Sequence, residues 1–166
     1  MKRKTLSSNL LAPALVALTL FAVDARAADD AESAIRAVLV NWTNNFNAGK
    51  ADVVCDLFDP ELRYEYRGFP ERGYRDICKL LQSSLADDSK TYAYSLDIQE
   101  VLVSGNLAVV RLVWTLKATL GNGQEVTSVE PGMDVFRRAP DGTWKIFRYL
   151  AYEAPGPAMA SVPPAE

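Results

Sequence analysis

The stretch from residue 91 to residue 152 constrains the fold most, because it consists of four strand-like segments separated only by short turns. The segments alternate apolar with polar residues or form runs rich in aromatic and β-branched residues, as half-buried strands do. Turn motifs separate them: Ser-Gly-Asn at 104–106, Gly-Asn-Gly at 121–123 and Ala-Pro-Asp-Gly at 139–142. Such turns join antiparallel neighbours. The predicted strands cover residues 91–103, 107–120, 124–138 and 143–152.

The third of these strands is interrupted by Glu130-Pro131-Gly132. Proline has no N–H to give to a strand ladder, so the sequence predicts a bulge or a bend at this point. Long strands with such an interruption indicate a strongly curved sheet. We expect the hairpin from Gly132 to Glu153 to close that sheet.

Helical patterns dominate before residue 91. The first predicted helix opens at Asp29-Asp30 and stops at Asn47-Ala48-Gly49. A short helix over Ala51–Phe58, a strand over Leu62–Tyr66 and a helix over Tyr74–Leu85 follow. The order helix, helix, strand, helix and then four strands predicts an α+β fold, with three helices packed on one face of a curved antiparallel sheet. Such a sheet, closed by helices, encloses a cone-shaped pocket.

The N-terminus has the pattern of a secretory signal peptide. Basic residues precede an apolar run over Leu10–Val23, and Ala25-Arg26-Ala27 is a small-x-small cleavage motif. We therefore expect a signal peptide over 1–27, cleaved after Ala27, a folded domain over 28–153 and a disordered Pro-rich tail over 154–166. The expected location is periplasmic or secreted, without membrane attachment after cleavage. The alternative is an uncleaved N-terminal anchor.

Charge and composition exclude several classes of function. The chain has 18 basic and 21 acidic side chains; without the predicted leader, 14 and 20 remain, a net charge of −6. This balance argues against nucleic acid and anionic lipid as partners. The absence of histidine argues against a zinc site and against nucleophiles activated by histidine. We expect neither a metal nor a cofactor.

Two cysteines, Cys55 and Cys78, remain in the predicted domain. In an oxidising compartment they can form a disulfide. The alternative is a pair of buried thiols that never meet. The residues alone leave both open.

Four segments resemble the nuclear transport factor 2-like superfamily, which includes SnoaL-like cyclases and ketosteroid isomerase. They are WTNNFNAG at 42–49, VCDLFDP at 54–60, DVFRRAPDGTWKI at 134–146 and Ala151-Tyr152. The resemblance extends over nearly all of the predicted domain and implies the cone-shaped α+β fold. It also implies a homodimer or an accessory module that uses the open face of the sheet.

The resemblance carries the isomerase site over only in part. Trp42 stands where the isomerase has its oxyanion-hole tyrosine, Tyr66 stands where it has its aspartate base, and Asp134 stands where it has its protonated aspartate. That enzyme's aspartate is a known example of a carboxylic acid kept neutral by an apolar site. Glu65 neighbours Tyr66, but strand alternation points it to the opposite face. Without the base, steroid isomerisation is not expected.

Asp134 is the candidate catalytic residue, and three readings of it stay open. It can pair structurally with Arg111 or Arg148, it can act on a ligand or a water with Arg111 as partner, or it can lie in solvent. Counting across the turn at 121–123 places Arg111 almost opposite Asp134, and one bulged residue at 131–132 would bring them level. The residues predicted to bind a ligand are Trp42, Tyr64, Tyr66, Arg111, Asp134 and Tyr152.

Three functions follow from these patterns. The first is an exported homodimer that binds a small, largely apolar molecule without catalysis. The second is an isomerase, cyclase or hydratase that uses Asp134 as acid or base. The third is a dimerisation or accessory module. An Asp134 buried in a cavity without an arginine partner would favour the enzyme.

Overall fold

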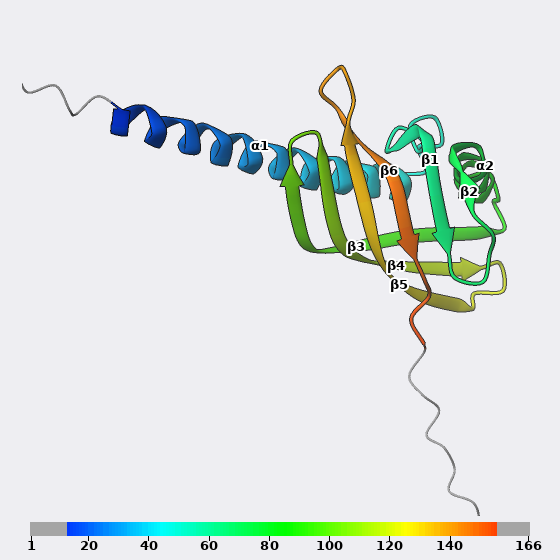
Figure 1. The fold of residues 1–166 in the computed structure, drawn as a ribbon. Helices are drawn as coiled ribbons and strands as arrows, with labels where there is room; N and C mark the ends of the chain where they lie inside the picture. Colours follow the sequence, from blue (N-terminus) through cyan, green and yellow to red (C-terminus); the bar gives the residue numbers. More distant parts are fainter. Residues whose placement is uncertain (1–12, 156–166) are drawn as a thin grey trace, which may run out of the picture.

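A computed structural model describes residues 13–155, with side chains from residue 27 onward. Residues 1–12 of the predicted signal peptide and residues 156–166 of the Pro-rich tail therefore lie outside the described residues. The elements run in the order α1 (Pro13–Asn47), β1 (Phe58–Tyr66), β2 (Arg72–Gly73), α2 (Tyr74–Leu85), β3 (Lys90–Ser104), β4 (Leu107–Leu120), β5 (Glu125–Arg138) and β6 (Trp144–Ala151). Figure 1 shows long, bent strands curling around the helices.

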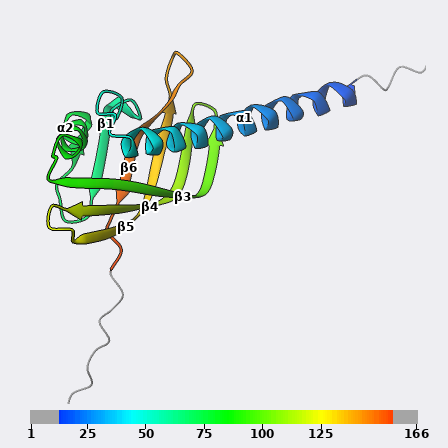
Figure 2. The same ribbon diagram turned by 180° about the vertical axis from the view of Figure 1, so that it is seen from behind.

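The strands form one six-stranded sheet in the order β2-β1-β6-β5-β4-β3. β3 to β6 make the predicted antiparallel meander, whereas β1 pairs with β6 in parallel. The sheet is therefore mixed rather than wholly antiparallel. The predicted α+β fold with a strongly curved sheet and helices on one face is confirmed (Figure 2). α1 packs against β3 and β6, and α2 packs against β1, β2 and β3.

The core lies between α1 and the concave face of the sheet. Ile35, Leu39, Trp42 and Phe46 of the predicted apolar stripe are all buried in α1. They meet side chains of the sheet that are almost inaccessible to solvent, which are Leu62, Val110, Leu112, Phe136 and Ile146. The 3.6-residue spacing of the stripe is what brings one helical face onto this surface.

The short helix predicted over Ala51–Phe58 is wrong. Residues 51–57 form successive turns, with i to i+3 bonds from Asp56 N to Val53 O and from Phe58 N to Cys55 O. The segment is held by its neighbours: Ile146 N donates to Leu57 O, and Phe58 pairs with Ile146 in β6. Because Phe58 already pairs with β6, β1 begins at Phe58, four residues before the start of the predicted strand at Leu62.

Of the bulge or bend predicted at 130–132, the bulge is wrong. β4 and β5 pair without a register shift from Leu107–Arg137 to Thr119–Glu125. Pro131 fits because its carbonyl accepts a bond from Tyr152 N, so its nitrogen faces the side where β6 has already ended, at Ala151. The irregularities in the sheet fall instead at Gln99 in β3, at Phe147 in β6 and between Phe58 and Arg63 in β1.

Cys55, in the turns before β1, lies beside Cys78 of α2, with the Cα atoms 5.4 Å apart. This separation suits a disulfide. That the bond forms in the exported protein stays a prediction. Within residues 13–155, no helix is both long enough and apolar enough to cross a membrane.

Candidate functional site

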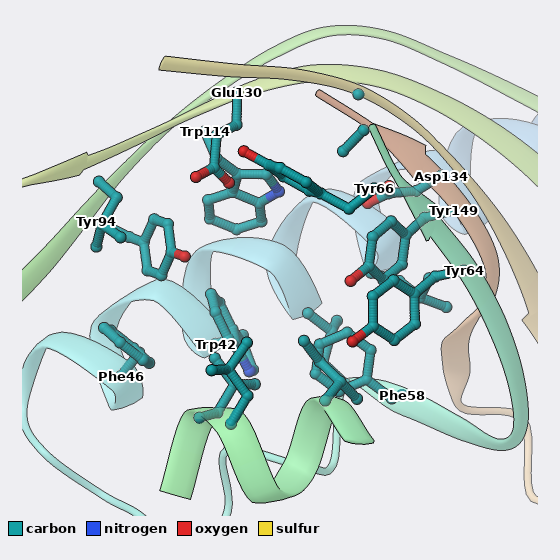
Figure 3. Close-up of a pocket in the computed structure, with 18 of the residues that line it drawn as sticks. Trp42, Phe46, Phe58, Tyr64, Tyr66, Tyr94, Trp114, Glu130, Asp134 and Tyr149 are labelled. Carbon is teal, nitrogen blue, oxygen red and sulfur yellow. The ribbon is translucent and has the colours of Figure 1, made fainter. Parts of the chain in front are cut away.

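A cavity of about 440 Å³ lies between the concave face of the sheet, the end of α1 and α2. This volume is in the range of small-molecule sites. Its wall is mostly apolar and aromatic, and two carboxylates, Asp134 and Glu130, reach it from β5. Figure 3 shows both carboxylates and the aromatic side chains around them.

Strand register explains how the wall is built. One row across the sheet consists of Tyr64 in β1, Tyr149 in β6, Asp134 in β5 and Val110 in β4. The next row holds Ala151 and Gly132, side by side between Tyr66 and Leu112. Because Gly132 and Ala151 present almost no side chain, this row leaves open space beside Asp134.

Asp134 is only 4% exposed, and within residues 13–155 it has no hydrogen bond or ion pair. Burial raises its pKa from about 3.8 to about 7. Desolvation disfavours the charged form of a carboxyl group, and no neighbouring cation offsets that effect. Its carboxyl group can therefore exist in both the protonated and the ionised form near neutral pH.

Of the three open readings of Asp134, the one that pairs it with an arginine is wrong. The unbroken register places Val110 opposite Asp134 and Arg111 opposite Met133, so Arg111 points to the outer face. There it bonds to Glu100 at 3.3 Å and to Gln99 at 3.2 Å. Arg148 stacks over Phe147 at 3.7 Å and donates to the Glu61 carbonyl.

Tyr64 and Tyr149 add hydroxyl groups next to Asp134. Their rings stack with centroids 4.4 Å apart, and in Figure 3 both hydroxyls point into the cavity. The Tyr64 hydroxyl is buried and has no hydrogen-bond partner within residues 13–155. Burial raises the pKa of Tyr149, so this phenol stays protonated and can donate.

Trp42, one of the residues predicted to bind a ligand, lines the cavity, but its polar atom is already engaged. Its Nε1 donates to the Val54 carbonyl at 2.7 Å. Trp42 therefore presents a ring rather than a donor, and the oxyanion-hole role of the corresponding isomerase tyrosine is not available to it. Its ring packs against those of Phe46, Tyr94 and Trp114.

Glu130 is a wall residue that the sequence reasoning missed. It lies four residues before Asp134 on the same face of β5, opposite Trp114 of β4. Ser128 Oγ donates to its carboxylate at 3.1 Å. Burial raises the pKa of Glu130. Residues two apart on a strand face the same side, so counting back from Asp134 in steps of two reaches Glu130. The bulge predicted at 130–132 would have turned Glu130 to the opposite face.

The other predicted ligand-binding residues divide into two groups. Tyr64 and Tyr66 line the cavity beside Asp134. Arg111 and Tyr152 do not: Arg111 lies on the outer face, and Tyr152 follows the end of β6 and is 41% exposed. Glu65 is exposed on the side opposite Tyr66, as strand alternation predicted.

An α+β cone with a side-chain-lined cavity defines the class of protein, and comparison with known proteins gives the family. The model of the SnoaL-like domain matches residues 39–149, so the chain belongs to the SnoaL-like domain family. No curated protein matches the chain by sequence.

Solved structures share the fold at low identity. A conserved protein from Planctomyces limnophilus is 20% identical, with a TM-score of 0.68 over 77% of this chain and 99% of its own. A nuclear transport factor 2-like protein with a cystatin-like fold from Novosphingobium aromaticivorans is 22% identical (TM-score 0.61; 90% and 95%). A ketosteroid isomerase-like protein from Erwinia carotovora atroseptica is 18% identical (TM-score 0.61; 75% and 96%). The family match over residues 39–149, together with this shared fold, confirms the predicted superfamily.

Proposed function

We propose that the protein binds a small, largely apolar molecule in the cone-shaped cavity and holds a polar group of that molecule with Asp134. The observation that carries this proposal is an unpaired carboxyl group, 4% exposed, in a mainly apolar wall. A buried polar group without a partner is costly, and a ligand that pairs with it recovers that cost. The space left by Gly132 and Ala151 lies directly beside this carboxyl group.

The donors in this part of the wall indicate which ligand group fits. Protonated Asp134 and the Tyr64 and Tyr149 hydroxyls can all donate a hydrogen bond. A carbonyl or hydroxyl oxygen on an apolar body accepts such bonds. The aromatic wall of Trp42, Phe46 and Trp114 suits a flat body.

The binding test uses acetonaphthone, a flat apolar ketone, with tryptophan fluorescence as the readout, since Trp42 and Trp114 line the cavity. Saturable quenching is the expected result. A Cβ at Gly132 would make only ordinary contacts, the nearest 3.4 Å away, and φ there is not positive, so Gly132→Leu should fold and fill the cavity. The expected loss of affinity is about tenfold or more, whereas Arg111→Gln on the outer face should bind unchanged. Equal binding by Gly132→Leu would refute the assigned cavity.

A second function, proton-transfer catalysis of the isomerase, cyclase or hydratase type, is favoured by the burial of Asp134 in the cavity without an arginine partner among the described residues, and by its pKa of about 7. A carboxyl group with this pKa can both accept and donate a proton at neutral pH. In D₂O, ionised Asp134 would remove a proton from the carbon next to the ketone of acetonaphthone, and deuterium would replace it. Proton NMR measures this exchange of hydrogen for deuterium. Exchange that is lost in Asp134→Asn supports the enzyme, whereas binding without exchange supports a binding protein without catalysis.

Export and homodimerisation also belong to this proposal. Met133 of β5 pairs with Leu150 of β6 on the outer face, and both side chains are about half exposed, at 48% and 58%. Large exposed apolar side chains that adjoin favour contact with another copy of the chain. Light scattering of the domain over residues 28–153 should give a dimer mass, and Met133→Lys with Leu150→Lys should give a monomer. Fractionation of cells should place the mature protein outside the cytoplasm.

A further inference from the structure

The end of the cavity around Glu130 differs in chemistry from the end around Asp134. Four residues along a strand separate the two carboxylates by about 13 Å of backbone. Gly132 stands between them on the same face of β5 and has no side chain to divide the space. Figure 3 shows Glu130 on the side of Trp114 and Tyr94, and Asp134 on the side of Tyr149 and Tyr64. A single ligand can therefore reach both carboxylates.

The only charged group that acts on Glu130 at close range within the described residues is another carboxylate. Its neighbours Ser128, Tyr66 and Glu153 include a second carboxylate and no cation. Arg72 also lines the cavity, but its guanidinium lies over the Phe69 ring, 4.6 Å from the centroid. The hydroxyls of Ser128 and Tyr66 both donate to Glu130, whereas a carboxylate has about four acceptor positions. The remaining positions are open to a donor from a ligand.

Aromatic rings surround this carboxylate. Trp114 is the cross-strand partner of Glu130, and the rings of Tyr94 and Trp42 pack within 6 Å of the Trp114 ring, at 5.5 and 5.2 Å between centroids. All three line the cavity. The faces of aromatic rings attract cations, and tryptophan does so most strongly. A carboxylate beside such rings is the combination that recognises a protonated amine.

We propose that Glu130, with Trp114 and Tyr94, forms a subsite for a protonated amine, so that the ligand is an apolar molecule with an amine at one end. This inference rests on the proposed function, because it names the class of ligand that the same cavity takes. The polar group bound by Asp134 then lies at the other end of that ligand. A ligand without the amine would leave Glu130 with its negative charge half-buried and uncompensated.

The test compares the binding of naphthylethylamine with that of naphthylethanol. The two compounds share the same apolar body, but the first carries a protonated amine where the second carries a hydroxyl. Titration of the full-length protein near neutral pH should give about tenfold tighter binding of the amine. In Glu130→Gln the two affinities should agree within about twofold, with alcohol binding retained. Glu153→Gln is the matched control: it removes a neighbouring exposed carboxylate that does not line the cavity, and most of the preference for the amine should remain.

Each other outcome overturns a distinct part of the inference. Equal affinities in the unaltered protein would refute the amine subsite while leaving the ligand cavity in place. If the preference for the amine is lost in Asp134→Asn and kept in Glu130→Gln, the amine binds at Asp134 and not at Glu130, and the proposed subsite is refuted. If neither compound binds, and acetonaphthone does not bind either, the proposed function fails together with this inference.

Discussion

Replacing Asp134 by Asn should stabilise the protein, and the gain should grow with pH. The carboxyl group is 4% exposed and its pKa is about 7 in the fold, against about 3.8 when solvated. The folded state therefore holds a proton over this interval that the unfolded state has already lost. Because stability falls with pH wherever the folded state binds more protons, the contribution of Asp134 is intact below about pH 4 and is lost as the pH rises to about 7.

The size of the effect follows from the two pKa values. The full difference corresponds to about 4 kcal/mol in the free energy of unfolding. Between about pH 5 and about pH 8.5, the two-state expression leaves a change of about 3 kcal/mol. Asn keeps the shape of the side chain and does not titrate, so the stability of Asp134→Asn relative to the unaltered protein should increase by that amount across this range.

Urea denaturation of both proteins at the two pH values measures the difference directly, and other titrating groups cancel in the comparison. Asp97→Asn, which removes an exposed carboxylate from β3, is the control and should stay within about 0.5 kcal/mol of the unaltered protein at both pH values. A difference between Asp134→Asn and the unaltered protein that does not change with pH would refute the burial of an unpaired carboxyl group.

Three further predictions concern the frame of the site. Cys55→Ser should lower the free energy of unfolding by about 3 kcal/mol under oxidising conditions and by much less with reductant; two reactive thiols in the exported protein would contradict this. Asp59→Asn should cost about 1.5 to 3 kcal/mol in urea denaturation, because buried Asp59 accepts three bonds from Arg137, at 2.8, 2.8 and 3.1 Å; a neutral result would show that the pair is dispensable. Tyr64→Phe should leave stability unchanged or raise it by about 1 kcal/mol, since the lost hydroxyl has no partner, but should weaken ketone binding; a marked loss of stability would reveal a bond that the hydroxyl makes.

The sequence was sufficient for much of the architecture because periodicity and turn chemistry are local. The helix predicted over Tyr74–Leu85 matches α2, and the strand predicted over Leu107–Leu120 matches β4. The burial of Asp134 could be expected from an acid on an apolar strand together with the family resemblance. The helix predicted over Ala51–Phe58 fails because its apolar residues are placed by contacts with α1 and β6, which a local pattern does not contain.

The bulge wrongly inferred at Pro131 accounts for two of the errors in the site, the pairing of Arg111 with Asp134 and the omission of Glu130. A bulge at 130–132 would have shifted the register by one residue, and such a shift moves every side chain to the other face of the sheet. It brought Arg111 to Asp134, and it took Glu130 out of phase with Asp134. The bulge is unnecessary because β6 ends at Ala151, so no strand residue needs a hydrogen bond from the nitrogen of Pro131. That feature depends on the pairing of distant strands.

The central claim is that Asp134 is an unpaired acid facing a ligand cavity, and carbon-13 NMR of aspartate carboxyl groups tests it most directly. One carboxyl resonance should titrate near pH 7, be absent from the spectrum of Asp134→Asn, and shift when acetonaphthone is added. If every aspartate titrates below about pH 5, the carboxyl group of Asp134 is solvated or paired, and the account of the site is contradicted.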